Sequence, residues 1–178
     1  EAVAVGNDKQ LFADEFIVER ATDVTRELGT VTKANGGRPI SFWRAGPDGQ
    51  RRRMSVWQLF HSVYYDAERR VFRLWCRGLP GDDAYHADGT ADWDKVRYVY
   101  CESTDGVNFD LKSELHGLYS RGDYNLVVTF DERESDPEHR YRIGYDGARP
   151  DLPNGACLAH SADGIHWKLP NVAALARA

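Results

Sequence analysis

Two aspartates recur in the same short sequence and are the first carboxylates to consider for chemistry. Asp105 lies in Ser103–Phe109 (STDGVNF) and Asp163 lies in Ser161–Trp167 (SADGIHW). A carboxylate can act as a general acid or base, or it can accept backbone N–H bonds in a turn. An Asp-Gly pair favours the left-handed backbone of a two-residue hairpin turn, and the aromatic residue that follows can pack back on the strands. The sequence therefore predicts that both aspartates are structural.

Other reactive side chains lack the spacing of a metal, nucleophile or phosphate site. The cysteines Cys76, Cys101 and Cys157 show no C-x-x-C spacing and cannot all pair within one chain, so we expect buried free thiols. The six histidines include no His-x-x-x-His pair. The segment 35–37 (NGG) is too short to cradle phosphate, and no dinucleotide fingerprint or Ser/His/Asp motif occurs. The sequence therefore implies no cofactor and no metal.

The segments that would position functional residues have the character of short β-strands. They are aromatic and β-branched, with Gly, Asp or Pro between them. Apolar residues on both alternating sides of 71–76 predict a strand buried between two layers. Only Asp92–Lys95 and Val172–Ala178 have helical character, and both are brief, so we predict an all-β fold. The predicted strands are Val56–Tyr65, Val71–Cys76, Val96–Glu102, Leu126–Phe130, Tyr141–Tyr145 and Ala156–His160.

These strands form an internal repeat in which the order of the elements is conserved between the two copies. Residues 63–66 match 128–131, 71–74 match 140–143, 102–109 match 160–167 and 121–122 match 177–178. The offsets between the copies are 65, 69, 58 and 56 residues. A unit of about 60 residues with four short strands is what one blade of a β-propeller requires.

The repeated turn, the opening segment 10–19 (QLFADEFIVE) and the strand 72–75 (FRLW) together resemble a known family. They are similar to the five-bladed β-propeller glycosidase superfamily, which contains glycoside hydrolase families 32 and 43, and more narrowly to bacterial family 32-like proteins. The resemblance runs from about Gln10 to Ala178 and implies a partial five-bladed propeller of four-stranded antiparallel blades. Residues 1–55 would be an N-terminal segment and loop, 56–120 the first blade and 121–178 the second.

A complete propeller of this kind would need roughly 300 residues by the same repeat arithmetic. We therefore expect the 178 residues to be the N-terminal part of a propeller. Its open edges would be covered by missing C-terminal blades, by a partner or by another copy in a homo-oligomer.

The resemblance also implies carboxylates that flank a glycosidic bond where the inner strands meet the propeller axis. Asp123 is the best candidate, and Arg121 beside it could keep it ionised or could instead tie a loop to the strand. The first blade places Gln58 opposite Asp123, and an amide cannot act as nucleophile or base. Asp14 and Glu15 are further catalytic candidates, although a structural role is favoured for both.

Sugar rings present apolar faces that stack on aromatic side chains, so aromatic residues near the inner strands are candidate binding residues. Trp75 and Trp167 lie within blade strands and are expected in the core. Asp136 lies in 135–138 (SDPE), which resembles the Arg-Asp-Pro motif of family 32, but it is expected in a solvated turn. Of the candidate binding residues, the two tryptophans are expected to precede or begin the first inner strand. The residues that the resemblance implies for sugar binding are Arg121, Trp57, Gln58, His61, Tyr124 and Trp43.

Three hypotheses for function remain open. The chain is a glycoside hydrolase or part of one, a non-catalytic carbohydrate-binding module, or an assembly piece that associates with another chain or copy. The formal net charge of −5 argues against nucleic acid and anionic membranes as partners. The resemblance implies carbohydrate as the partner. An extracellular or periplasmic location is favoured.

Overall fold

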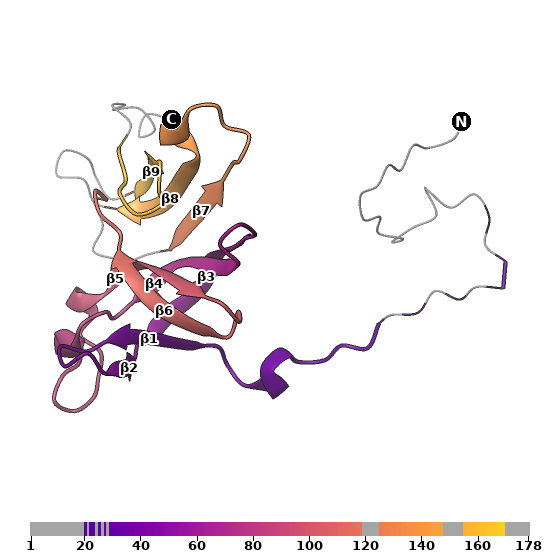
Figure 1. Cartoon of the computed structure of the whole chain (residues 1–178). Coiled ribbons are helices and arrows are strands. Elements are labelled where there is room, and N and C mark those ends of the chain that lie inside the picture. The colour runs from indigo at the N-terminus through magenta and orange to yellow at the C-terminus, as the bar shows by residue number, and fades with distance from the viewer. Residues whose placement is uncertain are drawn as a thin grey trace. The chain divides into compact units, whose positions relative to one another are not determined.

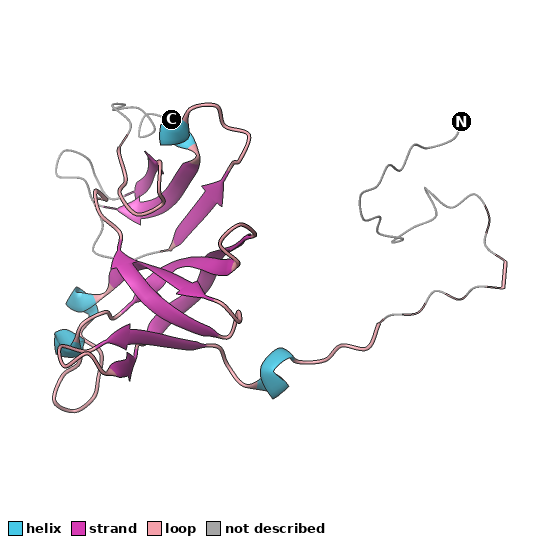
Figure 2. Ribbon diagram, viewed as in Figure 1, coloured by secondary structure: helices cyan, strands magenta, loops and turns pink. Residues whose placement is uncertain are grey.

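The computed structural model of the chain describes residues 20, 22, 23, 25, 27, 29–118, 125–147 and 155–169, with backbone alone at 34 and 57–61. The chain divides into two units, Glu1–Ala34 and Asn35–Ala178, and the strands belong to the second. The described residues contain no α-helix, only 3₁₀ turns between strands (Figure 2). The prediction of an all-β fold is therefore confirmed.

A six-stranded sheet forms the larger part of the second unit, with the order β2-β1-β6-β5-β4-β3 (Figure 1). Strands β3 to β6 form an antiparallel meander. Strand β1 then joins the edge of β6 in parallel, and β2 pairs with β1 in an antiparallel hairpin. The strand bounds are β1 (Ser41–Ala45), β2 (Arg51–Arg53), β3 (Val56–Asp66), β4 (Val71–Gly78), β5 (Arg97–Ser103) and β6 (Asn108–Glu114).

A second, three-stranded sheet is an antiparallel meander in the order β7-β8-β9. Beyond β9 the chain turns back, and Lys168 forms an antiparallel bridge with His160. Residues 167–169 of this return therefore correspond, in the repeat, to β6, the last strand of the first meander. The bounds are β7 (Leu126–Phe130), β8 (Tyr141–Gly147) and β9 (Gly155–Ser161).

All six predicted strands are confirmed, with ends that differ by two residues or fewer. Three strands were not predicted from the sequence, namely β1, β2 and β6. The basic run Arg51–Arg53, in a Gly- and Pro-containing segment that would suggest a loop, forms edge strand β2. An edge strand tolerates successive charged residues, since one side of it faces solvent.

The repeat predicted from the sequence reappears in the strand register. In the first meander Tyr65 lies opposite Phe72, which lies opposite Ser103 on the next strand. In the second, Phe130 lies opposite Tyr141, which in turn lies opposite Ser161. The aromatic pairs have similar ring separations, 4.9 Å for Tyr65–Phe72 and 4.6 Å for Phe130–Tyr141. Corresponding residues of the repeat therefore occupy corresponding places in the two meanders.

Both Ser-x-Asp-Gly segments fold into the same hydrogen-bonded turn. Asp105 Oδ1 accepts the backbone N–H of Val107 at 2.8 Å and of Asn108 at 2.7 Å. Ser103 Oγ accepts the N–H of Gly106, whose φ of 70° is readily adopted by glycine. Asp163 accepts the N–H of Ile165 and His166 in the same way. The structural role of both aspartates is confirmed.

The turn is longer than the two-residue hairpin expected from the Asp-Gly pair. Residues 104–107 separate β5 from β6. The difference arises because one carboxylate oxygen holds two successive N–H groups ahead of it, which curls the chain before the next strand begins.

These turns predict that acid destabilises the fold. Hydrogen bonds from Asn108 and Val107 hold the pKa of Asp105 well below its usual range. Partial burial alone would raise the pKa of Asp163, but hydrogen bonds from His166 and Ile165 outweigh it and hold this pKa well below its usual range too. A carboxyl with a lower pKa in the folded state stabilises the protein above the unfolded pKa of about 3.9 and loses that contribution as pH falls. We expect the midpoint temperature of thermal unfolding to decrease as the pH is lowered from about 5 to about 2. Asp105→Asn should flatten this dependence in calorimetry, and an unchanged slope would contradict the assignment.

The largest apolar cluster lies between the two meanders and is built around Trp75 of β4. This side chain is fully buried, and its Nε1 donates to the carbonyl oxygen of Gly164 at 2.7 Å. Trp167 is 4 % exposed in the same cluster, which confirms the prediction that both tryptophans are core residues. Leu126, Val128, Tyr141, Ile143, Tyr145 and Ala159 complete the second sheet's side of this interface.

The opposite face of β4 packs in a second cluster with Met54 and Phe109, so β4 is buried on both faces as predicted. Cys76 and Cys101 lie in this cluster as buried free thiols, whereas Cys157 is half-buried. The hydrogen bond to Cys101 and burial raise the pKa of Cys76 well above its usual range. Cys76 is therefore a protonated core thiol at neutral pH.

Candidate functional site

The two meanders have the same orientation within the second unit. Near the start of β4, Arg73 donates to the hydroxyl of Tyr141 at the start of β8. At the other end, Tyr98, opposite the end of β4, donates to the carbonyl of Asp146 near the end of β8. Both contacts require β4 and β8 to run the same way, so the first strands β3 and β7 also begin at one shared end.

Strands β3 and β7 also contact each other directly. Ser62 Oγ accepts the N–H of Val128 at 2.7 Å, and the hydroxyl of Tyr64 donates to the carbonyl of Val128 at 2.9 Å. The residues at the starts of β3 and β7 therefore belong to one end of the molecule. We call it the strand-start end.

Most of the sequence-predicted site residues cannot be placed in this geometry. Asp123, Arg121, Tyr124, Asp14 and Glu15 all lie outside the described residues. Their catalytic and binding roles stay predictions.

Three other predicted residues lie on β3, where the backbone is described. Trp57 and Gln58 are at the strand-start end of β3, and His61 lies farther along it. The register places Trp57 opposite Arg77 of β4. The strand that carries these residues is therefore the one expected, while their sugar contacts stay a prediction.

Trp43 is not where the sequence placed it. It was expected to precede or begin the first inner strand, but it lies on β1, which pairs with β6 at the far edge of the sheet from β3. The error arises because a parallel pairing between segments 67 residues apart leaves no local signal in the sequence. Trp43 therefore does not share the strand-start end with Trp57.

Sequence reasoning missed a charged group at the strand-start end. Arg77 is 5 % exposed at the end of β4, opposite Trp57. Its position within an aromatic strand (FRLWCRG) is the only signal that could have indicated it. A buried arginine therefore lies at the strand-start end, opposite Trp57 in the strand register.

The opposite end of the meanders contains a cavity of about 500 Å³ bordered by Tyr64, Arg73, Phe130 and Tyr141. Arg73 Nε donates to the Tyr100 hydroxyl at 2.8 Å, and its two terminal nitrogens donate to Tyr141 and to the Asp163 carbonyl. The guanidinium carbon also lies 5.1 Å from the Trp75 ring centroid. Each guanidinium nitrogen of Arg73 therefore donates a hydrogen bond within the protein. Because Tyr100 belongs to the first sheet and Tyr141 to the second, these bonds connect the two sheets.

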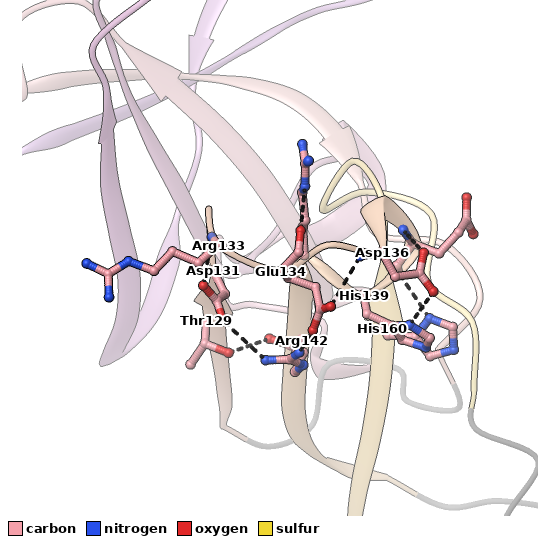
Figure 3. A network of polar contacts seen from close by, with 10 residues as sticks. Thr129, Asp131, Arg133, Glu134, Asp136, His139, Arg142 and His160 are labelled. Carbon is pink, nitrogen blue, oxygen red and sulfur yellow. Dashed lines mark hydrogen bonds and ion pairs between the residues drawn. The ribbon is translucent and has the colours of Figure 1, made fainter.

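The β7–β8 loop carries a polar network on the surface (Figure 3). Arg142 forms an ion pair with Glu134 and lies 3.9 Å from Asp131. Asp136 accepts the N–H of Glu138 at 3.0 Å, which caps the 3₁₀ turn Pro137–His139. Asp136 also contacts His139 Nδ1 at 2.9 Å. The solvated turn expected around Asp136 is confirmed.

His139 of this loop lies beside His160 of β9. His139 and His160 have ring centroids 4.2 Å apart, and His160 Nδ1 contacts the carbonyl of Glu138. No cluster of three or more His, Cys, Asp or Glu side chains suited to a metal ion occurs within 29–118, 125–147 and 155–169 or at the few described residues before them. In the same part of the chain, no helix has the length and apolar character needed to cross a bilayer.

Comparisons with protein-family models, with curated proteins and with solved structures each found no match.

Proposed function

We propose that the two meanders are successive blades of a β-propeller that binds an oligosaccharide or polysaccharide at the strand-start end, with Asp123 as the carboxylate that acts on the glycosidic bond. The observation that supports this proposal most strongly is that the second sheet leaves exposed the middle of the face that the first sheet buries.

The buried face of the first sheet packs on the second through Tyr64, Arg73 and Trp75, with Tyr100 beside them. The repeat offsets assign each of these positions to a residue of the second sheet. The corresponding residues are Thr129, Arg142, Gly144 and Leu158.

This face of the second sheet is open. Val127 is 54 % exposed and Leu158 is 51 % exposed, and both lie in register with Gly144 between them. Gly144 occupies the position that Trp75 has in the first sheet. The exposed side chains of Val127 and Leu158 are therefore separated by a position without a side chain. An exposed apolar face of this kind is typical of a surface that another unit covers.

A third meander could pack on this face as the second meander packs on the face that carries Trp75. Such packing would continue the arrangement in the same direction. Repetition of this kind around an axis produces a propeller, whose first strands line the central channel. The contact between β3 and β7 fits this role, since both would be innermost strands. The sugar would then lie near Trp57, Gln58 and the buried Arg77.

Hydrolysis at this end would require two carboxylates, one to protonate the leaving oxygen and one to attack carbon or activate water. Gln58 on the first strand of the first meander favours the second candidate function, in which the same end binds carbohydrate without turnover. Amides bind sugar hydroxyls but are too weak as acids and bases to transfer a proton in catalysis near neutral pH.

A glycan panel tests the proposal. The wild-type chain should bind at least one neutral or acidic oligosaccharide and release reducing sugar from it. Asp123→Asn should reduce turnover by about 10³-fold while binding is retained, because removal of a general acid or base costs about 10²–10⁴-fold. Glu132→Gln, at the opposite end, removes the same charge and should leave turnover unchanged. Binding without turnover would support the non-catalytic alternative, and absence of binding across the panel would overturn the proposal.

A further inference from the structure

The hairpin β1–β2 and the neighbouring strand β6 form a polar surface that the proposed function does not use. Two clefts lie on it, one of about 520 Å³ and one of about 350 Å³. The larger is bordered by Arg38, Trp43 and Arg53, and the smaller by Arg51 and Asp110. Because Asn108 borders both clefts, we treat them as one continuous groove, the Trp43 groove.

Trp43 borders the larger cleft of this groove and is held in place from both sides. In the register it lies opposite Arg53 on β2 and opposite Asp110 on β6. The guanidinium carbons of Arg51 and Arg53 are 4.6 Å and 5.4 Å from its ring centroid. Its Nε1 donates to Asn108 Oδ1 at 3.4 Å. A half-buried indole fixed in this way is oriented before a ligand arrives, and the two guanidinium groups over its ring leave only the rest of the indole for contact with that ligand.

The arginines around Trp43 are not equally neutralised. Arg51 forms an ion pair with Asp110 at 2.8 Å. Arg53 contacts the hydroxyl of Ser41 at 3.5 Å, and Arg38 donates to the carbonyl of Asn35 at 3.4 Å. In the part of the chain that the structure describes, neither Arg38 nor Arg53 has a carboxylate partner. The groove therefore presents two guanidinium groups that can receive an anion.

The composition of the groove restricts the ligand. A planar guanidinium binds a carboxylate through two parallel hydrogen bonds, and an indole favours the apolar face of a sugar ring. The amides of Asn35 and Asn108 can pair with hydroxyl groups. The smaller cleft has walls of both charges, because two basic and three acidic side chains border it. A ligand that combines carboxylates, hydroxyl groups and apolar ring faces fits the walls of the larger cleft.

We propose that the Trp43 groove binds an acidic oligosaccharide whose sugar units carry carboxylates, that is, a uronic-acid chain. The Trp43 indole supports one sugar ring, and Arg38 and Arg53 receive its carboxylate. The two connected clefts accommodate more than one sugar unit. The choice of a carbohydrate ligand rests on the proposed function, whereas the site lies on the edge of the sheet away from β3 and does not involve Asp123.

Titration calorimetry with an oligogalacturonate, and with a neutral oligosaccharide of the same length, tests this inference. The acidic ligand should bind more tightly than the neutral one, and its affinity should fall as salt is added. Trp43→Ala should weaken acidic binding about 10-fold or more, because stacking contributes on the order of 1 kcal/mol or above. Arg38→Gln should also weaken it about 10-fold, since a charge-assisted pair contributes about 1.5–3 kcal/mol.

Matched controls separate the groove from a general charge effect. Arg133→Gln removes a positive charge on the β7–β8 loop, and Trp93→Ala removes a tryptophan that is 56 % exposed elsewhere. Both should leave acidic binding unchanged. Circular dichroism of Trp43→Ala and of the exposed Arg38→Gln checks that the fold is kept, so a loss of binding in Arg38→Gln is informative even if Trp43→Ala does not fold.

The outcomes distinguish this inference from the proposed function. Acidic binding that Arg38→Gln weakens and Asp123→Asn leaves unchanged supports the groove. Equal binding of acidic and neutral ligands, or binding that depends on Asp123 and not on Arg38, overturns it while the proposed function stands. Displacement of the oligosaccharide by equimolar sulfate would also overturn it, because the groove would then be a simple anion site.

Discussion

Replacing Trp75 by alanine is expected to destabilise the second unit by about 3–5 kcal/mol, because a fully buried tryptophan leaves a large cavity when truncated. Trp75 is the most central side chain of the cluster between the two meanders and contacts the rings of Tyr64, Tyr100 and Tyr141. The indole also donates to the carbonyl of Gly164, so truncation leaves a buried acceptor without its donor. Few single changes in the chain should cost more.

Urea unfolding followed by circular dichroism would measure this loss of stability. Trp75→Phe keeps an aromatic ring but removes the N–H donor, so we expect a smaller loss of about 1–3 kcal/mol. Trp93→Ala, at a side chain that is 56 % exposed, should change the unfolding free energy by less than about 1 kcal/mol. Equal effects of the Trp75 and Trp93 truncations would show that the two sheets do not depend on this interface.

Gly117→Ala should lower stability by about 3 kcal/mol, the second-largest effect we expect from one substitution. Gly117 has φ of 85°, and a Cβ there would overlap the carbonyl oxygen of Trp167 and lie 3.1 Å from its carbonyl carbon. The adjacent His116 donates its N–H to Ile165 and accepts the N–H of Trp167 at 2.8 Å. The backbone approaches so closely here that only a residue without Cβ fits.

Gly49→Ala provides the matched control for this prediction. Gly49 has a similar φ of 74°, but a Cβ there would meet nothing within 4 Å. Its substitution should cost only the conformational strain of a left-handed residue, about 1–2 kcal/mol. The difference between the two variants, measured by thermal or urea unfolding, isolates the steric contribution of the contact with Trp167. No difference would contradict the close approach.

Much of the fold could be predicted from the sequence because each of its main strands has a local residue pattern typical of a strand. Tyr141–Gly147 and Val71–Gly78 have aromatic and β-branched residues on alternating sides, and each was found within two residues of its ends. Strand β6 escaped because its polar sequence (NFDLKSE) lacks a continuous apolar face. The hairpin β1–β2 escaped because its pairing partner lies more than 60 residues away in the chain.

The candidate site could be predicted less well than the fold. The turn aspartates Asp105 and Asp163 were assigned correctly, since an Asp-Gly pair has a local hydrogen-bonding explanation. Trp43 was misplaced, because the position of a side chain on a sheet depends on strand order, which involves distant residues. Arg77 was overlooked because burial of a charge is decided by tertiary packing.

The parallel pairing of β1 with β6 has a consequence for the order of folding. The hairpin β1–β2 can form early, but its register partners Asn108–Asp110 follow about 65 residues later in the chain. Closing such a long connection is entropically costly, so nonlocal pairings form slowly. During synthesis from the N-terminus, the hairpin would therefore lack its β6 partner until the whole first meander had emerged. The edge of the sheet that carries the Trp43 groove would be the last part of the first sheet to assemble.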